Sequence, residues 1–461
     1  VMMIAPLIQP EIKELIDNRE FSVLKEVFSE WTPADLAELI SELPEDEQII
    51  IFRLLPKQLQ SETFEYLEYD IQEHLLSNLA KKQIADILNE MSPDDRTALF
   101  EELPADLLRQ MLALLSKEER ITAMTLLGYP ENSVGRLMTT DYIAVKENMT
   151  IAQVLHYIRK YGKDSETLNM LYVIDDNGKL IDDIKMRQVL LSQPTRRIKT
   201  LMDHKFVSLN AFDDQETAIQ VFKKYDHYAL PVIDADGVLL GIVTIDDVLD
   251  VEEKEVTEDI HKMAAVEALE EPYIDEPILR LTRKRATWLV VLFIGEMLTA
   301  TAMGYFEQEI AKAVVLALFV PLIISSGGNS GSQASTLVIR AMAVGEITLK
   351  DWSRVLFREI QSGFLLGLIL GSIGFLRISI WQRFSGIYGQ HWIGIAISVA
   401  LALLGVVLWG TTVGSMLPFI LRRLGLDPAT SSAPFVATLV DVSGLIIYFN
   451  VAYLLLKGSL L

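Results

Sequence analysis

The chain has 461 residues, half of them hydrophobic, yet its formal net charge is -22. This acidic balance argues against nucleic-acid binding, which needs a basic surface, and the absence of cysteine excludes disulfides and thiolate metal sites. The acids crowd before about Glu276 and long apolar runs follow. We therefore predict a multidomain membrane protein whose acidic part either attracts cations or, as composition alone favours, keeps a cytosolic region soluble.

Residues 1–133 are predicted to form an acidic domain of helical repeats. Four proline steps divide this segment: Leu43-Pro44, Leu55-Pro56, Ser92-Pro93 and Leu103-Pro104. Proline suits the first turn of a helix, where its missing N–H is not needed. Most of these starts are about a dozen residues apart, which predicts short stacked helices in an all-α superhelix.

Residues 134–250 contain a duplication that begins at Arg136 and again at Thr200. The expected strands are 142–145, 170–175, 206–209, 229–234 and 239–244, and the expected helices are 151–161, 186–191, 216–225 and 246–250. Two tandem β-α-β-β-α units of this kind resemble a pair of CBS motifs, an α/β fold that often binds adenine nucleotides such as ATP. The resemblance implies that Thr244 and Asp247 hold a ribose. Arg187 stands near the position where the first copy would carry threonine, and many CBS pairs bind no nucleotide.

Residues 251–279 form an acidic segment, in which Lys254 and Lys262 are the only lysines that oppose the acids. Neither glycine nor proline occurs from Val251 to Glu271, so a long linker helix of about 30 Å is expected. Glu255, Glu258 and Asp259 lie at i, i+3 and i+4 and share one face of it. That face is either solvated or a site where a divalent cation relieves the repulsion.

Residues 280–461 are predicted to form a transmembrane domain of five helices in the lipid bilayer. The apolar runs are 288–306, 313–339, 360–376, 392–421 and 428–456, each near the 20 residues that a spanning helix needs. Lysine and arginine near the ends of the runs number ten on one side and four on the other. This bias places the N-terminus in the cytoplasm and the C-terminus outside the cell membrane.

Asp441 lies near the middle of the fifth run, where an acid costs about 3 kcal/mol and so normally faces water or a partner. Thr438 shares its helical face, and Pro434 and Gly444 flank the pair and can turn carbonyls toward a cavity. Glu296 in the first run is a weaker candidate that either pairs with another helix or lies near the interface. The alternative is that Asp441 has a structural role and is paired with another group within the helix bundle.

The second run holds the polar, glycine-rich stretch 325–333, which either lines a pore beside Asp441 or allows close helix packing. Carboxylates, hydroxyls and carbonyls suit hard cations such as Mg2+ or Ca2+. Two copies of Asp441 on a dimer axis would bind such an ion better than one. This chemistry leaves Mg2+, Ca2+ and Mn2+ open.

The whole chain resembles the MgtE family of magnesium channels. The resemblance rests on the order of the parts and on three motifs, at 321–331, 417–428 and 437–444. It implies a homodimeric Mg2+ channel in which Asp441 holds the hydrated ion. The pore candidates are Asp441, Ala437, Thr438, Gly328 and Asn329.

The same resemblance implies that cytosolic Mg2+ closes the channel. The linker helix would be a plug, and its acids Glu255, Glu258 and Asp259 would share Mg2+ with Asp427 at the cytosolic mouth. Further Mg2+ would bridge acids of the helical domain to acids of the CBS pair. These bridging candidates are Asp94, Asp95, Asp246, Asp247 and Asp250.

Three alternatives remain. The first is a secondary transporter coupled to H+ or Na+. The second is a CBS-regulated membrane enzyme such as an intramembrane metalloprotease, which would need a His-Glu-x-x-His stretch that the chain lacks. The third is a sensor that transports nothing, which would leave the intramembrane Asp441 unexplained.

Overall fold

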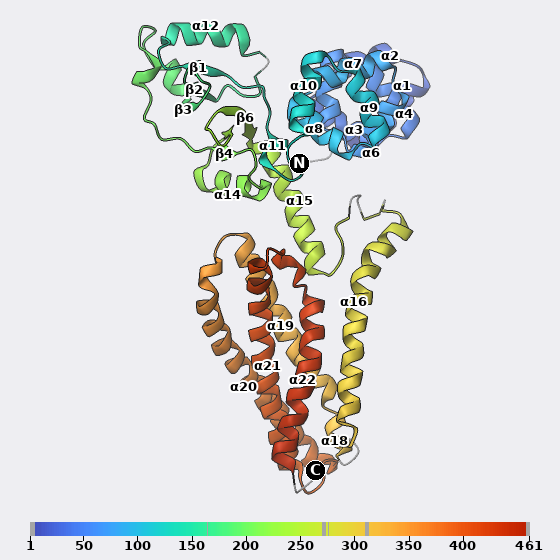
Figure 1. Cartoon of the computed structure of the whole chain (residues 1–461). Helices are drawn as coiled ribbons and strands as arrows, with labels where there is room; N and C mark the ends of the chain where they lie inside the picture. Colours follow the sequence, from blue (N-terminus) through green and yellow to red (C-terminus); the bar gives the residue numbers. More distant parts are fainter. Residues whose placement is uncertain (1–4, 164, 270–272, 275, 309–312, 458–461) are drawn as a thin grey trace. The chain divides into compact units, whose positions relative to one another are not determined.

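The computed structural model describes residues 5–163, 165–269, 273–274, 276–308 and 313–457 (Figure 1). These residues form two compact units, one up to Glu252 and the other from Glu253 onward. The first unit contains an all-α domain and two small α/β modules. The second contains five helical segments that are long and apolar enough to cross a membrane. The predicted multidomain fold class is confirmed.

The all-α domain is a stack of short helices around one apolar core. They are α1 (Ala5–Asp17), α2 (Phe21–Phe28), α3 (Pro33–Ser41), α4 (Glu45–Leu54), α5 (Lys57–Glu65), α6 (Tyr69–Asn78), α7 (Lys81–Glu90), α8 (Pro93–Glu102), α9 (Ala105–Leu114) and α10 (Lys117–Leu126). The proline steps mark helix starts as predicted. Pro93 lies in the first turn of its helix, whereas Pro44, Pro56 and Pro104 lie one position earlier, at the N-cap.

The two α/β modules have the same topology. Their elements are α11 (Val134–Leu137), β1 (Ala144–Lys146), α12 (Ile151–Tyr161), β2 (Met170–Ile174), β3 (Leu180–Lys185) and α13 (Met186–Leu190), then η1 (Ile198–Thr200), β4 (Leu209–Asn210), α14 (Gln215–Tyr225), β5 (Ala229–Ile233) and β6 (Leu239–Thr244). In each three-stranded sheet the first pair of strands is parallel and the second antiparallel. Both antiparallel pairs shift register at the equivalent step, after Val173 and after Val232. The shared irregularity supports the predicted duplication.

The acidic linker differs from the prediction at both ends. The helix expected at 246–250 and the linker helix are one continuous helix, α15 (Ile245–Met263). It ends eight residues before Glu271, because Ala265 adopts a left-handed conformation with φ of 57°. The amide of Val266 then donates to the carbonyl of His261 and closes the helix. The linker helix is therefore shorter than predicted, although its sequence contains neither glycine nor proline.

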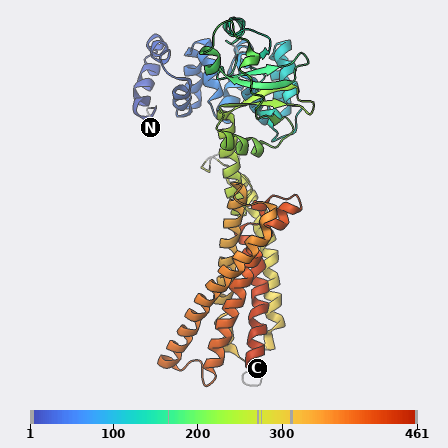
Figure 2. The same ribbon diagram turned by 90° about the vertical axis from the view of Figure 1, so that its left-hand side faces the viewer.

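The second unit contains the spanning segments (Figure 2). They comprise α16 (Ile278–Tyr305), α18 (Val314–Ala317), α19 (Val320–Ala343), η2 (Leu349–Asp351), α20 (Trp352–Ser385), α21 (Trp392–Arg423), η3 (Pro428–Thr430) and α22 (Ala433–Leu456). The second predicted span is divided between α18 and α19. The fifth begins at Ala433 instead of 428, because Asp427 caps η3 and the hydroxyl of Ser432 then caps α22.

Glycine allows α19 and α21 to approach backbone to backbone. A Cβ atom at Gly414 would lie 2.1 Å from the carbonyl oxygen of Gly331, and one at Gly410 would lie 2.5 Å from that of Gly327. Neither position has room for a side chain. The glycine-rich stretch of α19 therefore provides close packing on its α21 side, which was one of its two predicted roles.

Candidate functional site

Asp441 lies on α22 opposite the glycine-rich stretch of α19. A Cβ atom built at Gly328 would be 3.3 Å from Oδ1 of Asp441 and 3.4 Å from Cβ of Ala437. Asp441, Ala437 and Thr438 are each partly exposed. The structure thus brings together the predicted residues Asp441, Ala437 and Gly328, with the carboxylate facing a bare stretch of backbone.

The other two predicted pore residues, Asn329 and Thr438, form hydrogen bonds within their own helices. Asn329 is exposed, and its side-chain amide donates to the hydroxyl of Ser325 at 3.3 Å. The hydroxyl of Thr438 donates to the carbonyl of Pro434 at 3.0 Å, within its own helix. Pro434 and Gly444 do not loosen the backbone as predicted, because Pro434 lies in the first turn and α22 continues through Gly444.

Serine hydroxyls of α19 fasten the segment that leads into α22. Ser332 donates to the carbonyl of Ala433 at 2.9 Å, and Ser335 donates to that of Ser431 at 3.0 Å. Ser335 and Ser431 are fully buried. These bonds fix the start of α22 against α19, so that the carboxylate of Asp441 is held at a defined height beside Gly328.

Within the second unit, the end of α15 contacts Asp427 through a lysine. The ammonium of Lys262 lies 2.7 Å from Oδ2 of Asp427 and 2.5 Å from Oε1 of Glu258. Burial would lower the pKa of Lys262, but its bonds to Asp427 and Glu258 outweigh this effect and raise it. The two acids that were predicted to share Mg2+ are therefore bridged by a cation of the chain itself.

The other linker acids surround this bridge. Burial, followed by repulsion from Asp427, raises the pKa of Asp259 to about 6. Glu255 and Glu258 add to that repulsion. Among the described residues, the ammonium of Lys262 therefore lies amid acids that repel one another.

In the first unit, acids of α8 face acids at the start of α15. Asp94 is 7% exposed, and its Oδ1 atom has no hydrogen-bond partner among the described residues. Burial, followed by repulsion from Asp247 and Asp95, raises the pKa of Asp94. Asp246 and Asp250 in turn repel Asp95. The structure therefore brings together all five predicted bridging acids.

Two further acids of this cluster were not predicted. Glu65 and Glu166 are both repelled by Asp95, and Glu166 also repels Asp94. Burial raises the pKa of Glu65 to about 8, and its Oε1 accepts a bond from the amide of Ser92 at 3.1 Å. Neither residue belongs to a distinctive sequence pattern. Only the tertiary arrangement of α5, α8 and the first α/β module identifies them.

The predicted ribose-binding pair is formed within the second module. The hydroxyl of Thr244 donates to Oδ2 of Asp247 at 2.5 Å. Burial raises the pKa of Asp247 to about 7, although the bond from Thr244 opposes that shift. Arg187 is exposed on α13 of the first module. Asp247 therefore belongs both to the acid cluster and to the candidate nucleotide site.

The acids of these clusters are oxygen donors of the kind that Mg2+ takes. In the part of the chain that the structure describes, no three His, Cys, Asp or Glu side chains are arranged to hold one metal ion. Mg2+ commonly keeps several waters and uses only one or two carboxylates. Asp94, whose buried Oδ1 atom has no partner among the described residues, and the neighbouring Asp247 suit that mode.

Comparison with protein families gives three matches along the chain. A family model described as a divalent cation transporter, MgtE, matches residues 320–451. The MgtE intracellular N domain matches residues 31–132, and the CBS domain matches residues 134–191 and 198–254.

Two curated relatives illustrate matches that cover most of the chain. The magnesium transporter MgtE of Thermus thermophilus is 38% identical over 97% of this chain and 98% of the relative. The magnesium transporter MgtE of Bacillus subtilis is 30% identical over 74% of this chain and 73% of the relative. The solved cytosolic domain of the Mg2+ channel MgtE in complex with ATP is 34% identical, with a TM-score of 0.50, over 52% of this chain and 98% of that one.

Proposed function

Because the chain belongs to the MgtE family of divalent-cation transporters, we propose that it is a homodimeric channel that imports Mg2+ across the cell membrane. The observation that carries the proposal is the position of Asp441. Its carboxylate lies close to the backbone of α19 at Gly328, where even a Cβ atom would be 3.3 Å from Oδ1. Two such carboxylates on a dimer axis would hold a divalent ion between them.

The oxygen-rich surroundings favour a hard cation that remains hydrated. Mg2+ gives up water reluctantly and is bound through few direct ligands. A carboxylate beside an open backbone can contact the waters of such an ion. Relatives named magnesium transporters support the choice of Mg2+ over Ca2+.

Cytosolic Mg2+ closes the channel in this proposal. Mg2+ would bind between the acids of α8 and those at the start of α15, and would also bind near Asp427 and the linker acids. Without Mg2+ these acids repel one another, and the plug leaves the pore. Mg2+ shifts the equilibrium between the open and closed states only by its differential affinity for the two states. Several weak sites together can supply that difference in affinity.

An adenine nucleotide is the proposed second ligand of the cytosolic region. The Thr244–Asp247 pair would hold its ribose, and the solved relative with ATP supports nucleotide binding by this kind of domain. Because Asp247 also faces Asp94, bound nucleotide and regulatory Mg2+ would influence each other. The proposal takes the N-terminal region to be cytoplasmic and the C-terminus to lie outside, as the lysine and arginine bias predicts.

The test is Mg2+ uptake into proteoliposomes by the Asp441→Asn variant. Uptake should be abolished, because the amide keeps the shape of the carboxyl group but not its charge. Glu346→Gln removes an exposed acid of the same unit and should leave uptake unchanged. Normal uptake by Asp441→Asn would reject Asp441 as the pore carboxylate.

A further inference from the structure

Glu296 is an acid in the membrane-spanning part of α16 that the proposed function leaves unused. It lies eleven residues beyond Arg285, the last basic residue of its helix, which is about 16 Å along the axis. Its side chain is exposed within the chain. Among the described residues, no basic side chain forms an ion pair with it. An exposed, unpaired acid at this depth in a membrane is costly unless water or a cation reaches it.

Glu296 directly follows Gly295, where α16 comes close to α22. A Cβ atom at Gly295 would lie 2.8 Å from Cγ2 of Thr438, so α16 approaches α22 closely one turn before Asp441. The charge of Glu296 repels the carboxylate of Asp441. Two intramembrane acids, Glu296 and Asp441, therefore lie near the seam between α16 and α22.

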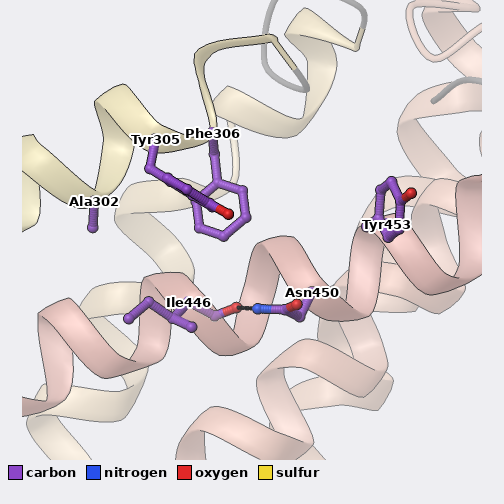
Figure 3. Close-up of a pocket in the computed structure, with 6 residues that line it drawn as sticks. All are labelled: Ala302, Tyr305, Phe306, Ile446, Asn450 and Tyr453. Carbon is purple, nitrogen blue, oxygen red and sulfur yellow. Dashed lines mark hydrogen bonds between the residues drawn. The ribbon is translucent and has the colours of Figure 1, made fainter.

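A cavity continues along this seam toward the C-terminal end of α22. It has a volume of about 510 Å3 and is lined by Ala302, Tyr305, Phe306, Ile446, Asn450 and Tyr453. Figure 3 shows Ile446 and Asn450 on α22 across from Tyr305 and Phe306 of the α16 side. Ile446 is five residues beyond Asp441, about 8 Å along the helix. The cavity contains an amide and two phenol groups, so it can hold water.

We propose that Glu296 is a second carboxylate of the permeation path, which acts beside Asp441 to favour divalent over monovalent cations. The seam cavity would be the aqueous approach from the C-terminal side. A fixed negative charge attracts a divalent ion twice as strongly as a monovalent ion at the same distance. This inference rests on the proposed channel function and on Asp441 as its pore carboxylate.

The experiment compares Glu296→Gln with wild type and with Glu307→Gln in planar bilayers that contain Mg2+ and K+. Glu307 is an exposed acid just beyond the end of α16 and serves as the matched control. Glu296→Gln should lower the permeability ratio of Mg2+ to K+ roughly tenfold, as expected for one charge near the path. Glu307→Gln should leave this ratio unchanged.

The outcomes separate the two proposals. If wild type conducts Mg2+ and Asp441→Asn does not, but Glu296→Gln keeps the wild-type ratio, the role of Glu296 is overturned and the channel stands. If wild type conducts no Mg2+, the channel proposal itself fails. Glu296→Ala removes the same charge and is measured in the same way if Glu296→Gln does not fold. A normal ratio in that variant also overturns the role of Glu296.

Discussion

Replacing Lys262 by glutamine tests how the linker helix is held against Asp427. The ammonium of Lys262 contacts both Glu258 and Asp427, and the three side chains are 29–40% exposed. Without it, these acids and Asp259 lose the cation that offsets their repulsion. In the proposed mechanism, the closed state then depends more strongly on Mg2+.

The size of the effect follows from the exposure of the two ion pairs. Exposed pairs contribute about 0.2–1 kcal/mol each, and only the Lys262–Asp427 pair joins the linker helix to another segment, because the pair with Glu258 lies within α15. This range corresponds to a roughly 1.4- to 5-fold change in the closed-to-open ratio. High salt should reduce the difference in this ratio between Lys262→Gln and wild type, because partly exposed charges are screened.

The assay is the channel current of inside-out patches while Mg2+ on the cytosolic face is varied. Lys262→Gln should raise the Mg2+ concentration that halves the current. Lys254→Gln removes an exposed lysine of the same helix and should leave that concentration near its wild-type value. An unchanged or lower concentration in Lys262→Gln would refute the role given to the bridge.

Three further results are expected. Burial raises the pKa of Asp247 to about 7 and that of Glu65 to about 8, above the value of about 4 in an unfolded chain. The folded state therefore binds more protons, and in metal-free buffer its melting temperature should fall as the pH rises from about 5 to about 8; Mg2+ should reverse most of this fall. Thr244→Val should weaken ATP binding about 3- to 10-fold in calorimetry through the lost hydrogen bond, and equal affinity would argue against the ribose site. Gly414→Ala should lower the melting temperature of the purified protein, because its Cβ atom would overlap the carbonyl of Gly331; an unchanged value would show that α19 and α21 are less closely packed.

The elements of the α/β modules followed closely from the sequence. The helix from Ile151 to Tyr161 and the strand from Leu239 to Thr244 have the predicted bounds. The helix start is encoded locally by the Thr150 capping box, and the strand is a short, continuous run of mostly apolar residues. The strands near 142 and 206 begin later than predicted, at Ala144 and Leu209, because strand pairing is a tertiary property.

The candidate sites were less completely predictable. Asp441 could be found because an acid is conspicuous in an apolar run. Glu65 was not found, because a buried acid at the end of a short helix looks like any surface acid in the sequence. Lys262 was visible among the linker acids, but its contact with Asp427 spans 165 residues and depends on how the helices pack.

The most direct test of the account is the current carried by the reconstituted wild-type protein when Mg2+ is the only permeant cation. We expect a current that follows the Mg2+ electrochemical gradient without an H+ or Na+ gradient and that falls when Mg2+ is raised on the cytosolic face. A Mg2+ flux that requires a coupled ion, or a current indifferent to cytosolic Mg2+, would contradict the account.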